Sequence, residues 1–279
     1  MYCKELRVDF DFQDQKRIAG ILARISYFLH PDIVSKIQEC NRESKEEFEK
    51  ILKKSIQDEE VVGRLMDKYL FDGSDCVFPF TRRHIGDEGH INGRYDRLKY
   101  YTREWAIIDD NEFPRHIWTF LLIDRCFNGE KWKNSGASNF ELAHVFNHKR
   151  NGDTTAMDEF FRVPHEDFHK VQYLFTSAAN VVMIPKGMAK PTDALRLVQK
   201  MFFQRMMDLY GYSILKSKPE YSLSVEELKL YRNLEWKAPF RPDNWSERID
   251  DLNKYRIRRV EGIMAKHVVE NGHADLNLE

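Results

Sequence analysis

The sequence predicts an α+β fold in which helices predominate. Apolar residues recur at helical spacing near both ends of the chain, and the short apolar runs between these regions are typical of strands. The chain has 279 residues, of which 42% are hydrophobic and 32% charged, so it can bury a substantial core. We therefore expect helical regions at the two ends and a mixed region between them.

Residues 1–71 are expected to form the first region, a run of helices. The apolar residues of its first helix keep helical spacing up to His30-Pro31, where the helix should end because a residue before proline disfavours helical dihedrals. Shorter helices are expected over 32–40 and 44–56. The simplest interpretation is a helical subdomain that packs on its neighbours, with partner binding or dimerisation as the alternative.

Residues 72–137 are expected to form a mixed region with a basic loop. Strand-like runs over 76–81 and 99–108 flank this loop, and a helix is expected over 113–127. Basic side chains interleave with aromatic ones in the loop, which suits phosphate contact combined with base stacking. Its candidates for phosphate contact are Arg82, Arg83 and Arg94. A solvated loop with half-buried tyrosines is the alternative.

Residues 138–215 contain two short apolar runs and a helix over 191–215 that we expect to be the longest of the chain. The first run reads Phe140-Glu141-Leu142-Ala143-His144, and the second reads Asn180-Val181-Val182-Met183-Ile184-Pro185. The last region, 216–279, should be helical. It contains Ser224-Val225-Glu226-Glu227, which matches a capping box, and a final helix that should start near Trp245 and run to about Val269.

The order of these features resembles the HNH, or ββα-metal (His-Me finger), nucleases. One strand ends at His144, and Asn180 opens a second strand that leads into a helix. The resemblance implies an embedded ββα-metal core in which His144 is the general base and Asn180 holds the metal. The family's accessory ligands are replaced here by Ala143 and Ala189. The chain therefore resembles the variant in which one Asn binds the ion and water and phosphate oxygens complete its shell.

The same resemblance implies further site residues, a cofactor and a substrate. Glu141 and His148 would add metal ligands, and the lysines nearby would clamp phosphate, namely Lys149, Lys186 and Lys190. The implied ion is Mg²⁺, with Mn²⁺ as an alternative, held by oxygen ligands. Structural zinc is not expected, because the four cysteines form no CxxC pair. The implied activity is that of a restriction- or defence-type endonuclease on double-stranded DNA, and a homodimer is compatible with it.

Two other function classes remain open. His165-Glu166-Asp167-Phe168-His169 matches HExxH, the signature of a zinc metallohydrolase, although Pro164 precedes it and no third ligand follows at helical spacing. The other class is a non-catalytic helical binding protein in which His144 is structural. The net charge of −1 argues against coating of DNA over the whole surface. The short apolar runs and the charged N-terminal residues predict a cytoplasmic protein without a membrane span.

Overall fold

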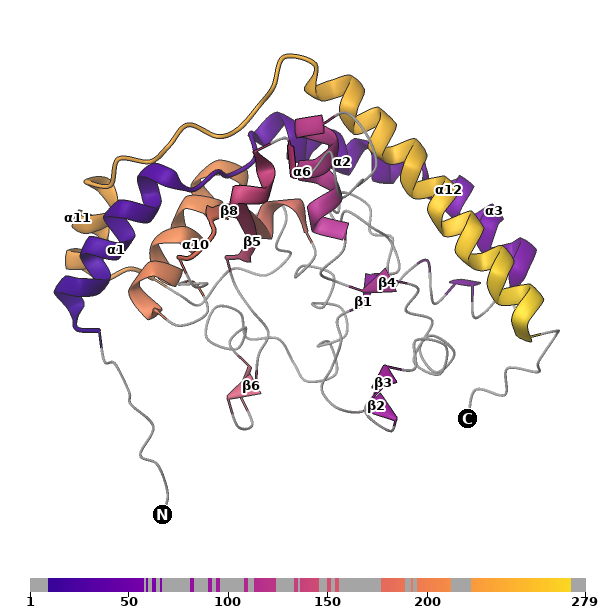
Figure 1. The fold of residues 1–279 in the computed structure, drawn as a ribbon, viewed down its shortest axis with the longest axis horizontal. Helices are drawn as coiled ribbons and strands as arrows, with labels where there is room; N and C mark the ends of the chain where they lie inside the picture. The colour runs from indigo at the N-terminus through magenta and orange to yellow at the C-terminus, as the bar shows by residue number, and fades with distance from the viewer. Residues whose placement is uncertain are drawn as a thin grey trace. The chain divides into compact units, whose positions relative to one another are not determined.

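The structure is a computed structural model. It describes residues 10–57, 113–123, 136–145, 177–188, 195–211 and 222–271, with short pieces at 59, 62–63, 66, 81–82, 90–91, 94–95, 108–109, 133–134, 150–151, 154–155 and 192. Within this part the fold is mostly helical, with small two-stranded sheets, so the α+β prediction is confirmed at that level (Figure 1).

The chain divides into two compact units, each assembled from three separate segments. Unit 1 draws on Met1–Phe28, Asn139–Arg162 and Val181–Phe240, and unit 2 on Leu29–Ser138, Val163–Asn180 and Arg241–Glu279. The four regions expected from the sequence are each a continuous stretch of residues, whereas each unit of the structure combines stretches that are far apart in the sequence. Each unit therefore combines residues from several of those regions.

Unit 1 is built around an antiparallel strand pair. Its elements are α1 (Phe12–Ile25), β5 (Phe140–His144), β6 (Arg150–Asn151), β7 (Thr154–Thr155), β8 (Val181–Pro185), α10 (Arg196–Tyr210) and α11 (Val225–Arg232). The β5–β8 ladder aligns Phe140 with Pro185 at one end and His144 with Val181 at the other, and β6 pairs antiparallel with β7. Helix α1 packs on both α10 and β8.

Helix α1 ends earlier than the sequence predicts. Asp11 accepts a hydrogen bond from the backbone N–H of Asp14 and so caps the helix, which stops at Ile25 rather than near His30. The reason is a non-local pairing: Tyr27 exchanges two backbone hydrogen bonds with Met183, at 2.9 and 3.1 Å, on the free edge of β8. The chain must be extended at Tyr27 to make this bridge, so the helix cannot continue.

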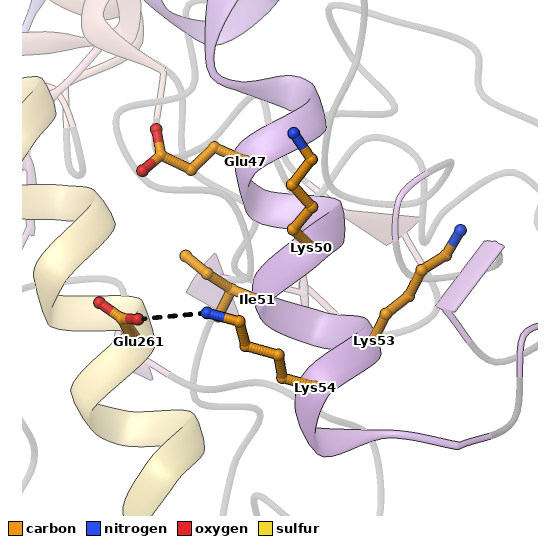
Figure 2. A pocket seen from close by; sticks show the side chains of 6 residues that line it. All are labelled: Glu47, Lys50, Ile51, Lys53, Lys54 and Glu261. Atoms are coloured by element: carbon orange, nitrogen blue, oxygen red, sulfur yellow. Dashed lines mark ion pairs between the residues drawn. The ribbon is translucent and has the colours of Figure 1, made fainter.

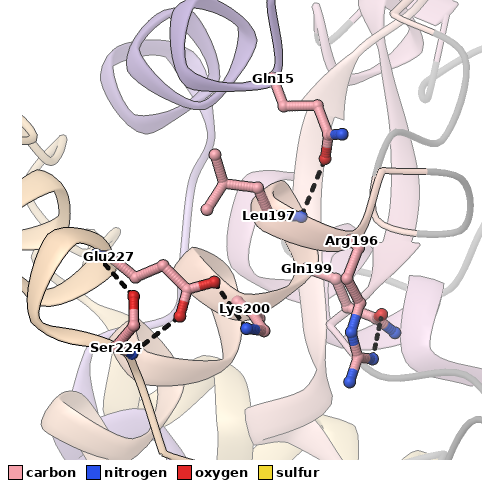
Figure 3. A network of polar contacts seen from close by, with 7 residues as sticks. All are labelled: Gln15, Arg196, Leu197, Gln199, Lys200, Ser224 and Glu227. Carbon is pink, nitrogen blue, oxygen red and sulfur yellow. Dashed lines mark hydrogen bonds and ion pairs between the residues drawn. The ribbon is translucent and has the colours of Figure 1, made fainter. Parts of the chain in front are cut away.

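Helix α10 begins and ends inside the predicted 191–215. Leu195, its N-cap, offers no capping side chain, but the Oε1 of Gln15 in α1 accepts a hydrogen bond of 3.0 Å from the backbone N–H of Leu197 (Figure 3). At the other end Gly211 has a φ of 71°, which lets the chain turn away from the helix. The longest described helix is α12 with 27 residues, not α10 with 15.

Polar and aromatic contacts join α10 to α11 and to the segment that follows. The capping box at Ser224 and Glu227 is confirmed, and Glu227 also pairs with Lys200 of α10 at 2.6 Å (Figure 3). The rings of Phe28, Phe202 and Trp236 form a triangle, with centroids 5.3 to 5.9 Å apart. These aromatic contacts fill the core of unit 1.

Unit 2 is a helical assembly with two minor sheets. Its helices are α2 (Pro31–Glu43), α3 (Lys45–Ser55), α6 (Phe113–Ile123) and α12 (Trp245–Asn271), and its short 3₁₀ turns are η2 (Ala137–Asn139), whose last residue falls in unit 1, and η4 (Ala178–Asn180). Its strands form the parallel pair β1 (Thr81–Arg82) and β4 (Ile108–Asp109) and the antiparallel pair β2 (His90–Ile91) and β3 (Arg94–Tyr95). Helix α6 is described to Ile123, and the rest of its predicted range lies outside the described residues.

Helix α12 is held to the other helices of unit 2 by buried polar contacts. Arg256, with 1% of its surface exposed, donates to the side-chain oxygen of Asn41 in α2. The side-chain amide of Asn253 donates to Ser44 at 2.9 Å, and the guanidinium of Arg248 donates to main-chain carbonyls in the last turn of α6. Such directional contacts fix the register of α12 more sharply than apolar packing alone. No described helix combines the length and the apolar character needed to cross a membrane.

Candidate functional site

The β5–β8 ladder positions the first candidate residue, His144. It is the last residue of β5, and the antiparallel register sets it opposite Val181, the first residue of β8. Val181 directly follows Asn180 in the chain. After β8 the chain returns through α10 in the same unit, so the described elements follow the order strand, strand, helix.

His144 lies in apolar surroundings. Alternation along β5 puts it on the same face as Phe140 and Leu142, and 9% of its surface is exposed. The neighbouring Val145 and its ladder partner Val181 are both fully buried. The imidazole is therefore held at the end of the ladder by apolar neighbours on both strands.

Asn180 is fully buried and closes the 3₁₀ turn η4. Its backbone N–H donates to the hydroxyl of Ser177 at 3.2 Å and to the carbonyl of Ser177 at 3.1 Å. Helix α2 packs on η4, so this turn belongs to unit 2, while β8 belongs to unit 1. The chain passes from one unit to the other between Asn180 and Val181.

The ladder does not gather Glu141 and Lys186 around His144. Glu141 pairs with Ile184 and lies three residues before His144, about 10 Å along the strand and on the opposite face. The backbone N–H of Lys186 donates to the carbonyl of Asn139 at 2.8 Å, which places Lys186 at the other end of the ladder, about 16 Å from His144. Lys186 and His144 are therefore too far apart to contact the same phosphate group.

The remaining predicted residues cannot be placed in the same way. His148, Lys149, Lys190 and Arg83 lie outside the described residues, as does the whole motif of His165, Glu166 and His169. The backbones of Arg82 and Arg94 lie in β1 and β3 of unit 2, and the description does not extend to their side chains. These predictions stay predictions.

In the described part of the chain, no group of three or more His, Cys, Asp and Glu side chains is arranged to hold an ion. The carboxamide oxygen of Asn180 is the kind of hard donor that Mg²⁺ accepts, and an ion held through one such residue keeps most of its water ligands. Asn180 is fully buried, however, and its role as a metal ligand stays a prediction.

Lys237 is a basic residue near the ladder that the sequence did not single out. Its ammonium lies 4.1 Å from the ring centre of Tyr27, the residue that pairs with the free edge of β8. The backbone N–H of Lys237 donates to the carbonyl of Ala23 at 2.9 Å, and this bond holds the backbone from which the Lys237 side chain extends. No local pattern around Lys237 predicts the contact, because its partner is more than 200 residues away in the chain.

A separate groove of about 500 Å³ lies in unit 2, between α3 and α12 (Figure 2). Its lining is Glu47, Lys50, Ile51, Lys53, Lys54 and Glu261. Side chains of both charges are present: Lys54 pairs with Glu261 at 3.8 Å, and Lys53 pairs at 2.7 Å with Glu49, which is not among the lining residues. None of the residues proposed from the sequence lines this groove.

Comparison with known protein families, curated proteins and solved structures found no match to this chain.

Proposed function

We propose that this chain is a metal-dependent endonuclease that hydrolyses phosphodiester bonds of nucleic acid, with double-stranded DNA as the substrate. One observation carries the proposal: a histidine ends the first strand of an antiparallel pair, opposite the start of the second strand, and a helix follows in the same unit. This order of elements, with His144 and Asn180 at those positions, is what the ββα-metal resemblance requires.

In the proposed mechanism His144 works as a general base. Its imidazole would accept a proton from water, a role that histidine fills more often than any other side chain. The water oxygen then forms a bond to the phosphorus, the bond to the 3′ oxygen breaks, and this oxygen takes up a proton from solvent water. A divalent ion such as Mg²⁺, for which Asn180 would be the protein ligand, supplies charge neutralisation at the phosphate and at the leaving oxygen.

Burial of the same residues favours a second candidate function, a non-catalytic helical binding protein. His144 is 9% exposed and Asn180 is fully buried, and burial of this degree is common for polar residues that stabilise a fold. In that case both residues are structural. Substitution experiments separate the two functions, because a base contributes to the rate and a structural residue to stability.

A plasmid-nicking assay tests the proposal. Supercoiled plasmid is incubated with Mg²⁺ or Mn²⁺ and with wild-type protein, His144→Gln or Leu142→Ala. Leu142 lies on the same strand face and is 7% exposed, so its substitution serves as the matched control for structural damage. We expect His144→Gln to lower the nicking rate roughly 100-fold or more, because a positioned general base contributes about that much, and Leu142→Ala to keep most of the activity.

No nicking by the wild type would refute the nuclease, and equal loss of nicking in both variants would refute the role of His144 as its general base. Stoichiometric bound zinc that disappears in His165→Ala would support the metallohydrolase instead. Thermal unfolding of each variant shows whether a lost activity reflects a lost fold.

A further inference from the structure

Helix α1 presents a basic outer face. Its inner face buries Ala19, Leu22 and Ala23 against α10 and β8, and this packing fixes which residues face outward. The exposed outer face carries Lys16, Arg17 and Arg24, which we call the α1 basic face.

Little acidic charge compensates the α1 basic face. Arg17 lies 3.6 Å from Asp14, but both side chains are largely exposed, at 78% and 45%, so this pair is weak. Neither Lys16 nor Arg24 forms an ion pair with any residue in the described ranges. The lysines of α3 differ, because two of them pair with glutamates.

Exposed apolar side chains accompany the α1 basic face. Phe12, with 37% of its surface exposed, precedes Lys16 by one helical turn, and Ile21, with 43% exposed, lies between Arg17 and Arg24. An exposed aromatic ring beside a cation can contact sugars and bases while the cation contacts phosphate. The inner apolar face of α1 is covered by protein, and Phe12 and Ile21, nine residues apart, lie on opposite sides of the helix, so they form no continuous apolar face to insert into a lipid surface.

We propose that the α1 basic face binds the phosphate backbone of duplex DNA. Arg17 and Arg24 are about 10 Å apart along the helix axis, and an equal length of the duplex axis carries about six phosphate charges on its two strands. This inference rests on the proposed nuclease function and adds a contact surface to the unit that contains β5, β8 and α10. The net charge of −1 makes such a local surface necessary, because the protein as a whole does not attract DNA.

The test compares two triple variants that each remove three positive charges. One is Lys16→Gln/Arg17→Gln/Arg24→Gln, and the matched control, on the exposed lysines of α3, is Lys50→Gln/Lys53→Gln/Lys54→Gln. Binding to a fluorescently labelled 20-base-pair duplex is measured by anisotropy over a range of salt concentrations. Each phosphate contact contributes about 0.9 to the slope of log affinity against log salt. We expect the α1 variant to flatten this slope by about 2 to 3 and the α3 variant by less than about 1.

Each alternative result decides the matter. Equal flattening in both variants, or no duplex binding by the wild type, overturns the inference. Wild-type binding to phosphatidylserine vesicles but not to duplex overturns it in favour of a membrane surface. Duplex binding that weakens only in the α1 variant, in a wild-type protein that never nicks plasmid, supports the α1 basic face while removing the nuclease.

Discussion

Protonation of His116 should destabilise unit 2 in mild acid. His116 is 4% exposed in α6, and its ring meets the edge of the Tyr255 ring of α12 at a centroid distance of 5.3 Å. Burial, helped by the positive charge of Arg259, lowers the pKa of His116 from 6.5 to about 4. The unfolded chain therefore binds this proton more tightly than the folded protein.

The direction and size of the effect follow from this pKa difference. The stability that the protein gains from keeping His116 neutral is fully present above about pH 6.5 and is lost as the pH falls towards 4. A shift of this size corresponds to about 3 kcal/mol in total, of which about 2 kcal/mol is lost by pH 5. His116→Phe keeps a ring against Tyr255 but cannot take up a proton.

Urea unfolding at pH 7 and pH 5 checks the prediction. Between these two pH values the wild type should lose about 2 kcal/mol more unfolding free energy than His116→Phe. Comparing differences removes both the constant effect of the substitution and the titration of all other groups. The same pH dependence in the two proteins would refute the reasoning, because it would mean that His116 is protonated equally easily in the folded and unfolded states.

Three further substitutions test the packing described above, each by chemical denaturation. Gln15→Ala removes the side chain that caps α10 and should destabilise by about 1 kcal/mol, whereas Gln13→Ala, on the exposed face of α1, should change little. Arg256→Ala leaves Asn41 without its buried donor and should cost about 3 kcal/mol, compared with roughly 0.5 kcal/mol or less for the exposed Arg258→Ala. Phe202→Ala opens a cavity in the aromatic core of unit 1 and should cost about 3 to 5 kcal/mol. A small effect at any of the three buried sites would contradict the contact assigned to it.

Local signals in the sequence predicted local structure well. The capping box at Ser224 and the start of α12 at Trp245 both depend on residues within one turn of the helix end, and both predictions are confirmed. The apolar runs around His144 and Val181 likewise predicted β5 and β8. In these cases the determining side chains and the structure that they determine are neighbours in the sequence.

Features set by distant residues could not be predicted in this way. The end of α1 depends on the bridge between Tyr27 and Met183, and the start of α10 is capped by Gln15 from the other end of the chain. In the candidate site, the position of His144 opposite Val181 likewise depends on the register between two strands that lie far apart in the sequence.

The division into two interleaved units has a consequence for synthesis and for protein engineering. Unit 1 needs segments up to Phe240, and unit 2 needs segments up to Glu279. Neither unit can therefore complete its folding while the ribosome is still making the middle of the chain. The apolar surfaces that α2 and α3 pack against α12 are covered only after α12 has been made, nearly 200 residues later. The partly synthesised chain therefore exposes apolar surface for a long time, which favours dependence on chaperones. It also means that no single cut in the gene separates the two units from each other.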